Sequence, residues 1–181
     1  MVLQTALALA GAALLVGHSP YKQWYAYRLQ RLIVVASGTD ARACRIADAV
    51  SERMLAQRPQ SKAMAGEGRS VRDVVQMLRT HQLHVAVLDL PSALAAYAGH
   101  AQFEREGPLA LRILVAFDDY LLVSLDDFPD DKAYEIAEAS GQLPRSVRAA
   151  AHSGRSADAS MIPLHPGALA FQQANPAQPA R

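Results

Sequence analysis

The sequence predicts an α/β fold, organised as a single lobe with a mostly parallel sheet flanked by helices. Two kinds of segment alternate along the chain: short apolar runs, as at 32–36 and 84–88, and stretches with apolar residues at helical spacing. Continuous apolar runs are typical of strands that are buried on both faces. Strand–helix units of about thirty residues indicate right-handed βαβ crossovers. A chain of 181 residues suffices for one such domain with a core.

The first predicted unit is a strand at 32–36 followed by a helix at 41–57. Either Thr39 or Asp40 supplies the side-chain oxygen that caps the start of this helix. Apolar residues then recur at helical spacing, which predicts an amphipathic helix with one face on the sheet. Residues 61–65 are the next strand candidate, and residues 66–69 form a predicted loop.

The second and third helices follow the same logic. Ser70, with Asp73 three residues later, resembles a capping box and starts a helix whose apolar face includes Val74 and Leu78. The apolar run 84–88 is the next strand. Asp89 then precedes a helix with Pro91 in its first turn, and this helix runs to residue 99.

The later part of the chain predicts two more strands and a further helix. A polar loop at 100–108 precedes apolar strands at 111–117 and 120–125, which Asp118 and Asp119 separate. An acidic turn starts a helix at 132–139. The predicted organisation is therefore a lobe at 32–140, a flexible loop at 141–161, a compact packing element at 162–173 and a disordered tail at 174–181.

The amino terminus predicts a membrane segment. Residues 2–17 carry no charged side chain and would reach roughly 24 Å as a helix, which suits a signal anchor or a signal peptide over residues 1–18. No small-x-small cleavage pattern follows, which favours an uncleaved anchor. Residues 19–31 form a predicted juxtamembrane segment, because aromatic rings and cations favour the headgroup layer. Its membrane-interface residues are Tyr21, Trp24, Tyr25, Tyr27 and Arg28. The cations follow the apolar run, however, so the positive-inside rule alone would keep the carboxy-terminal part in the cytoplasm.

Composition and motifs argue against several classes of function. A net charge of +1 gives no basic excess for nucleic acid. Cys44 is the only cysteine, so neither a disulfide within the chain nor a cysteine-based metal site is possible. His81 and His84 flank a predicted turn without a nearby third ligand, so no metal site is expected. No pairing of nucleophile and base is visible, and we expect a non-enzymatic protein without a cofactor.

The predicted topology instead indicates a binding edge. Helices that begin near Asp40, Ser70 and Pro91 would present their amino termini at the carboxyl edge of one sheet. Backbone N–H groups there favour an anion such as a carboxylate. The predicted ligand-binding residues are Gly38, Thr39, Asp40, Gly68, Ser70, Asp89 and Ser92.

Three stretches of the chain, in order, resemble the TAXI family of TRAP-transporter solute-binding receptors. They are LIVVASGTDARACRIADAVSERM, then GEGRSVRDVVQMLRTHQLHVAVLDLPSALAAYAG, and finally YLLVSLDDFPDDKAYEIAEA followed by IPLHPGALAF. Together they cover most of residues 32–172. The resemblance implies a periplasmic-binding-protein-like lobe in the bacterial periplasm, here held to the inner membrane by a single-pass anchor. It also implies a small anionic solute as ligand and a transporter as partner.

The chain also departs from the family pattern. Family receptors close two lobes on their ligand, whereas here the predicted strand 111–117 passes directly into the strand 120–125, so the segment that would build a second lobe is absent. The family's first turn is Gly-rich and contains an aromatic pair. This turn is not kept here, and residues 41–44 stand in its place. The resemblance therefore implies a receptor shortened to roughly one lobe, which binds a small carboxylate. The alternative is a non-catalytic scaffold or accessory subunit that docks this lobe onto a membrane or periplasmic complex.

Overall fold

The computed structural model describes residues 31–143 and 161–176, which form an α/β lobe around a five-stranded sheet. The strands lie in the order β2 (Met64–Gly68), β1 (Ile33–Ser37), β3 (Val85–Asp89), β5 (Tyr120–Leu125) and β4 (Leu111–Phe117). β1 pairs in parallel with β2 and β3, whereas β5 pairs antiparallel with both β3 and β4. The prediction of a mostly parallel sheet was therefore wrong in this part, and the sheet is mixed. The tight turn at Asp118 and Asp119 reverses the chain, which makes β4 and β5 a hairpin.

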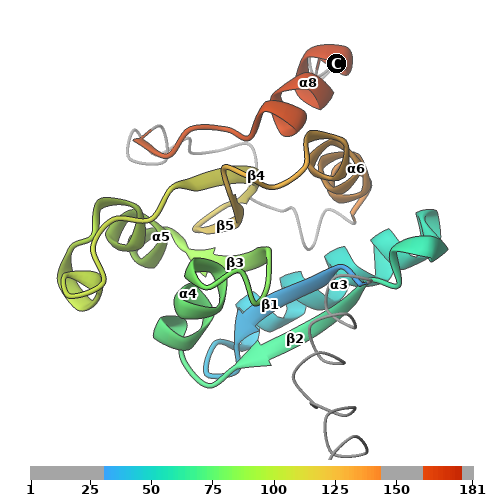
Figure 1. Ribbon diagram of the computed structural model, residues 1–181. Helices are drawn as coiled ribbons and strands as arrows, with labels where there is room; N and C mark the ends of the chain where they lie inside the picture. Colours follow the sequence, from blue (N-terminus) through green and yellow to red (C-terminus); the bar gives the residue numbers. More distant parts are fainter. Residues whose placement is uncertain (1–30, 144–160, 177–181) are drawn as a thin grey trace, which may run out of the picture.

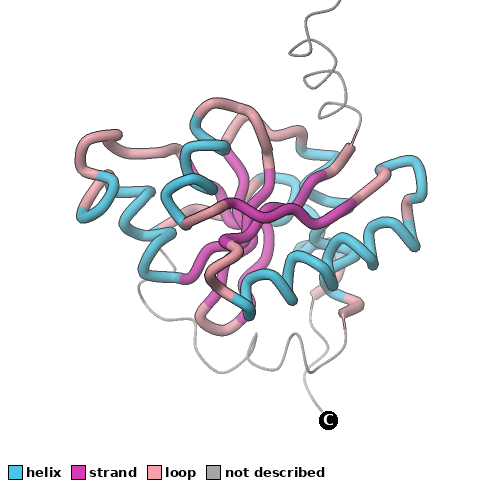
Figure 2. Tube along the Cα trace, turned by 90° about the horizontal axis from the view of Figure 1, so that it is seen from below, coloured by secondary structure: helices cyan, strands magenta, loops and turns pink. Residues whose placement is uncertain are grey.

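Helices cover both faces of the sheet, as Figures 1 and 2 show. α3 (Ala41–Gln57) and α6 (Asp130–Gly141) pack on one face, and α4 (Val71–Arg79) and α5 (Leu90–Ala98) pack on the other. The strands alternate accordingly: Val34 and Val87 face α3, while Val35 and Leu88 face α4. Strands buried on both sides have to be apolar throughout, which explains the continuous apolar runs in the sequence.

Most predicted elements agree with the structure, but β2 lies further along the chain than expected. The strand includes Gly66 and Gly68, which were predicted to lie in a loop. A Cβ at Gly66 would lie 3.1 Å from Ile33 Cγ2, and one at Gly68 would lie 2.7 Å from Val74 Cγ2. The glycines therefore allow close approach of neighbouring elements, a use of glycine in strands that propensity alone does not reveal.

The predicted polar loop at 100–108 contains a buried anchor. A short 3₁₀ helix, η2 (Ala101–Phe103), ends on Phe103, whose side chain is fully buried among residues of α4, α5, β4 and β5. Gly99 caps α5 with φ +68°, and a Cβ there would lie 2.4 Å from Pro108 N. The loop thus folds back tightly onto the end of α5.

The carboxy-terminal element covers the β4 edge of the sheet. Ile113 N–H donates to Pro163 O at 2.9 Å, and His165 N–H donates to Ile113 O at 2.9 Å. α8 (Pro166–Ala174) then packs against α6 and extends one residue past the predicted 162–173 element. A sheet edge with unpaired backbone groups is prone to aggregation. The contact with residues 163–165 covers the edge formed by β4.

Several predictions concern residues outside the described ranges. The anchor at 1–18, the interface residues Tyr21, Trp24, Tyr25, Tyr27 and Arg28, most of the 141–161 loop and the end of the tail all lie there. Among the described residues, no helix is long and apolar enough to cross a membrane.

Candidate functional site

The predicted ligand-binding residues lie at the carboxyl ends of β1, β2 and β3, where α3, α4 and α5 begin. Gly38 N–H donates to Gly68 O at 2.8 Å, which joins the turn after β1 to the end of β2. Thr39 Oγ1 lies 2.8 Å from Ser37 Oγ. The structure therefore brings the turns after β1 and β2 together as predicted from the topology.

Each of the three helices at this edge is capped by a side chain of its own sequence. Asp40 Oδ1 accepts from the backbone N–H groups of Arg42 and Ala43, both at 3.0 Å. Ser70 Oγ accepts from Asp73 N–H at 3.2 Å, and Asp89 Oδ1 accepts from Ser92 N–H at 2.8 Å. Such caps satisfy N–H groups that an incoming anion would otherwise use. A ligand carboxylate at this edge therefore requires donors other than these amides.

Tyr120 connects the α3 end of the site to the β3 end. Its hydroxyl donates to Asp40 Oδ2 at 2.9 Å, and its backbone pairs with Asp89 across the β3–β5 ladder. Burial, followed by the hydrogen bond to Asp40 and the charge of that carboxylate, raises the pKa of the Tyr120 phenol. The phenol thus stays protonated as a hydrogen-bond donor that fixes the Asp40 cap.

Arg42 is one cation of this site; Arg69, between Gly68 and Ser70, is another and pairs with Asp73 at 3.0 Å. Arg42 Nη2 lies 3.2 Å from Asp118 Oδ2, and its guanidinium carbon lies 5.3 Å from the centroid of the Tyr120 ring. The side chain remains 46 % exposed. A guanidinium has five N–H donors in a planar fork that matches carboxylates, so Arg42 can bond a second carboxylate while it keeps Asp118.

Sequence reasoning missed Arg42, Asp118 and Tyr120 as members of this site. Arg42 and Asp118 are 76 positions apart, and Asp40 and Tyr120 are 80 apart. The sequence did contain the two strands and the acidic turn between them. It did not show that β5 pairs with β3. This pairing places the turn between β4 and β5 next to the start of α3.

The remaining charge at the edge is mostly negative. Burial, and then the carboxylates of Glu67, Asp48 and Asp40, raise the pKa of the Cys44 thiol, which donates to Ser37 O at 3.3 Å. A protonated, hydrogen-bonded thiol is a poor nucleophile. Within residues 31–143 and 161–176, no group of three or more His, Cys, Asp or Glu side chains could hold a metal ion.

Comparison with known proteins gives no assignment: the chain matches no family model, and no curated protein matches it.

Proposed function

We propose that this protein is a membrane-anchored, extracytoplasmic binding protein of the TAXI receptor type, reduced to one lobe, that binds a small carboxylate at Arg42. The anchor and the family resemblance are the sequence arguments for this proposal. The structural support comes from the β4–β5 hairpin. β4 passes directly into β5 through the turn at Asp118 and Asp119, and the resemblance implies that a two-lobed receptor would send its chain into the second lobe at this point.

The donors and acceptors at this edge suit an amphoteric or acidic small molecule as ligand. Arg42 supplies a half-exposed cation with free coordination capacity in its planar fork. Thr39 and the surrounding carboxylates supply hydrogen-bond acceptors and, for Thr39, a hydroxyl donor. Within residues 31–143 and 161–176 no second lobe covers this edge, so a ligand there stays partly solvated, and its affinity is low unless a partner completes the site.

Thermal unfolding of the full-length chain tests the proposal. Glutamate and C4-dicarboxylates should raise the midpoint in a concentration-dependent way, since a ligand that binds only the folded state stabilises it. Arg42→Met should weaken binding about tenfold or more, because hydrogen bonds to charged groups contribute roughly 1.5–3 kcal/mol. Asp118→Asn should strengthen binding, because it removes the carboxylate that competes for Arg42.

Arg45→Met is the matched control for Arg42→Met. Arg45 is an exposed cation on the same helix and is not among the residues of the site. Equal responses of the Arg42 and Arg45 variants, or no response to any of these carboxylates, would count against a carboxylate site at this edge.

The second candidate is a scaffold or accessory subunit that docks the lobe onto a membrane or periplasmic complex. The self-capped helices and the excess of carboxylates at the edge favour it, because both reduce the attraction for a free anion. Crosslinking from Asp119, which is exposed at the tip of the hairpin, tests this alternative. A discrete crosslinked membrane subunit, together with no thermal shift by carboxylates, would support the scaffold.

A further inference from the structure

A second candidate site lies at the opposite end of the sheet, where β1 and β3 begin and β5 ends. A pocket of about 550 Å³ opens there between the end of α3 and the start of α6. Ligand pockets in proteins are typically about 300–1,000 Å³ in volume. The pocket shares no residue with the edge around Arg42, so its ligand is independent of the proposed carboxylate site, while its test in nanodiscs rests on the proposed membrane anchor.

The inner wall of the pocket is apolar and belongs to the core. Met54 and Ile136 are almost fully buried and come from α3 and α6, and Phe128 is 9 % exposed. Leu32 and Leu83, at the starts of β1 and β3, line the pocket and are only half-buried. Apolar side chains left partly uncovered around a concave surface favour an apolar occupant.

The rim of the pocket is polar and carries more cations than carboxylates. Its cations are Arg31, Arg58 and Lys132, and its carboxylates are Asp127 and Glu135. Glu135 is already paired with Arg58 at 3.6 Å and with Lys132 at 3.0 Å, and Asp127 Oδ2 lies 3.4 Å from His81 Nδ1. A cationic ligand would have to compete with these partners for the carboxylates.

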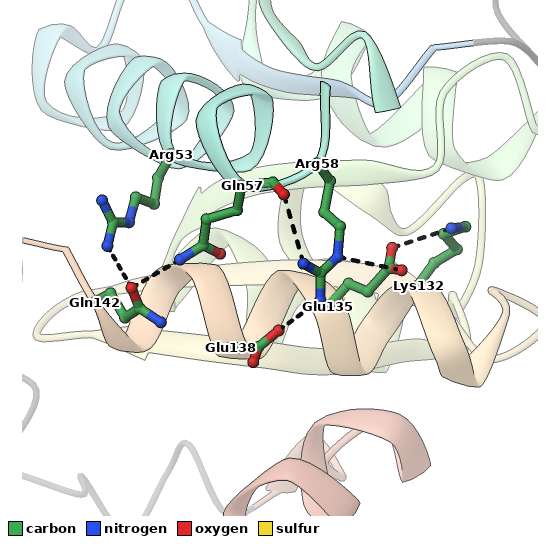
Figure 3. Close-up of polar contacts among 7 residues, drawn as sticks. All are labelled: Arg53, Gln57, Arg58, Lys132, Glu135, Glu138 and Gln142. Atoms are coloured by element: carbon green, nitrogen blue, oxygen red, sulfur yellow. Dashed lines mark hydrogen bonds and ion pairs between the residues drawn. The ribbon is translucent and has the colours of Figure 1, made fainter. Parts of the chain in front are cut away.

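Lys132 is the cation best placed to accept a new anion. Its ammonium has three donors, lies 3.0 Å from Glu135 Oε2 and 4.0 Å from Asp131 Oδ2, and keeps 51 % of its side chain accessible. Arg58 is held more firmly, since Glu138 and the Gln57 carbonyl accept hydrogen bonds from it and Glu135 forms an ion pair with it at 3.6 Å, as Figure 3 shows. Lys132 lines the same pocket as the apolar inner wall, so one ligand can contact both.

We propose that this pocket binds an amphipathic monoanion, with its apolar part on Met54, Phe128 and Ile136 and its anionic head at Lys132. A medium-chain fatty acid and an anionic phospholipid, through its acyl chain and phosphate head, share this chemistry. Burial of the hydrocarbon chain on the apolar wall provides most of the binding free energy, because it removes apolar surface from water. The contact between the anionic head and Lys132 makes the pocket prefer anionic over cationic amphiphiles.

Photolabelling tests the site on the full-length chain in phosphatidylcholine nanodiscs. The probe is a medium-chain fatty acid with a diazirine in its chain, and mass spectrometry locates the label. We expect saturable labelling of the peptides around Met54 and residues 128–136. Decanoate should displace the probe, whereas acetate, which lacks the chain, and decyltrimethylammonium, which reverses the charge, should not.

Variants of the rim separate pocket binding from partition into the lipid. At a probe concentration below saturation, Lys132→Glu should reduce labelling of these peptides about tenfold. Arg45→Glu, which makes the same charge change elsewhere, should leave the labelling unchanged. Gln60→Trp changes an exposed lining residue and should block labelling by covering the opening. Labelling that does not saturate, equal displacement by the cationic amphiphile, or equal labelling of the two charge variants would overturn the proposal.

A final arm distinguishes the two sources of the anion. The same labelling is repeated in nanodiscs that contain phosphatidylglycerol. Loss of labelling there identifies the anionic lipid as the occupant, and unchanged labelling identifies a free amphiphile.

Discussion

At the scale of single residues, the contact between α6 and α8 depends on a glycine. A Cβ at Gly167 would lie 2.0 Å from Asp130 O and 3.0 Å from Ala133 Cβ. The neighbouring His165 is fully buried, its Nε2 lies 2.8 Å from Phe128 O, and Gly167 N–H donates to its Nδ1 at 3.3 Å. These bonds define the tautomer with the proton on Nε2. The motif PLHPGA therefore locks the carboxy-terminal helix onto α6.

Gly167→Ala should destabilise the fold by about 3 kcal/mol, because overpacking against backbone atoms forces the two helices apart. Urea unfolding followed by circular dichroism measures the change. Gly141→Ala is the control at the same interface. A Cβ there would make only ordinary contacts, 3.5 Å and 3.6 Å from the Phe171 ring. An equal effect of both substitutions would contradict the steric explanation.

His84 gives stability a dependence on pH. Burial is the main cause that lowers the pKa of its imidazole, the charge of His81 adds to it, and Asp127 opposes it. Its folded-state pKa thus lies below the ordinary value of about 6.5. Stability from the neutral ring is present above pH about 6.5 and is lost as the pH falls through the folded pKa, because the unfolded chain then binds the extra proton.

Replacement of His84 by Gln should make the free energy of unfolding less dependent on pH between pH 7.5 and 5.5. Urea unfolding at both values measures the difference for each protein. If both proteins lose the same free energy over this interval, His84 is not responsible for the dependence.

At the scale of elements, a polar clasp joins α3 to α6 on the surface of the lobe, as Figure 3 shows. Arg58, which caps α3, pairs with Glu135 at 3.6 Å and Glu138 at 3.0 Å. Arg53 and Gln57 both donate to Gln142 Oε1 near the end of α6. The clasp holds the two helices that also form the walls of the pocket.

Arg58→Met should cost about 1 kcal/mol at low salt, since partly exposed ion pairs contribute roughly 0.2–1 kcal/mol each. The cost should shrink in 1 M NaCl, where charges are screened within about 3 Å. Arg53→Met is the matched control, because its partner is an uncharged amide and the cost should change less with salt. Unfolding free energies at both salt concentrations measure this. A cost for Arg58→Met that stays constant with salt would show that packing, not charge, dominates.

At the scale of the whole molecule, the described residues form two layers of core, one on each face of the sheet. One apolar cluster lies between the sheet and α3 with α6, and the other lies between the sheet and α4 with α5. Every member described for the two clusters lies between Leu32 and Leu164.

A chain that begins at Arg31 should therefore fold by itself in a single cooperative transition. Size-exclusion chromatography and thermal unfolding by circular dichroism measure this. Aggregation, or a broad non-cooperative transition, would show that the first thirty residues complete the fold.

The sequence by itself determined the secondary structure of most of the lobe, because the signals are local. The helix 41–57 and the strands 111–117 and 120–125 were predicted with the bounds that α3, β4 and β5 have. The cap at Ser70 was also predicted, and the cap of α3 was predicted at Thr39 or Asp40, of which the structure shows Asp40, since a cap involves residues only two or three positions apart. β2 and the buried Phe103 were missed, because glycine in a strand and an apolar residue in a polar loop are explained only by their tertiary neighbours.

Only the tertiary structure decided how these elements combine into sites. The predicted edge residues do gather where the helices begin, but their caps are satisfied internally, and Arg42 with Asp118 and Tyr120 sets the charge there. Nothing in the sequence pattern pointed to the pocket at the opposite end, whose lining comes from residues between 31 and 136. Local propensity is read over a few residues, whereas a site depends on which distant segments the sheet order places side by side.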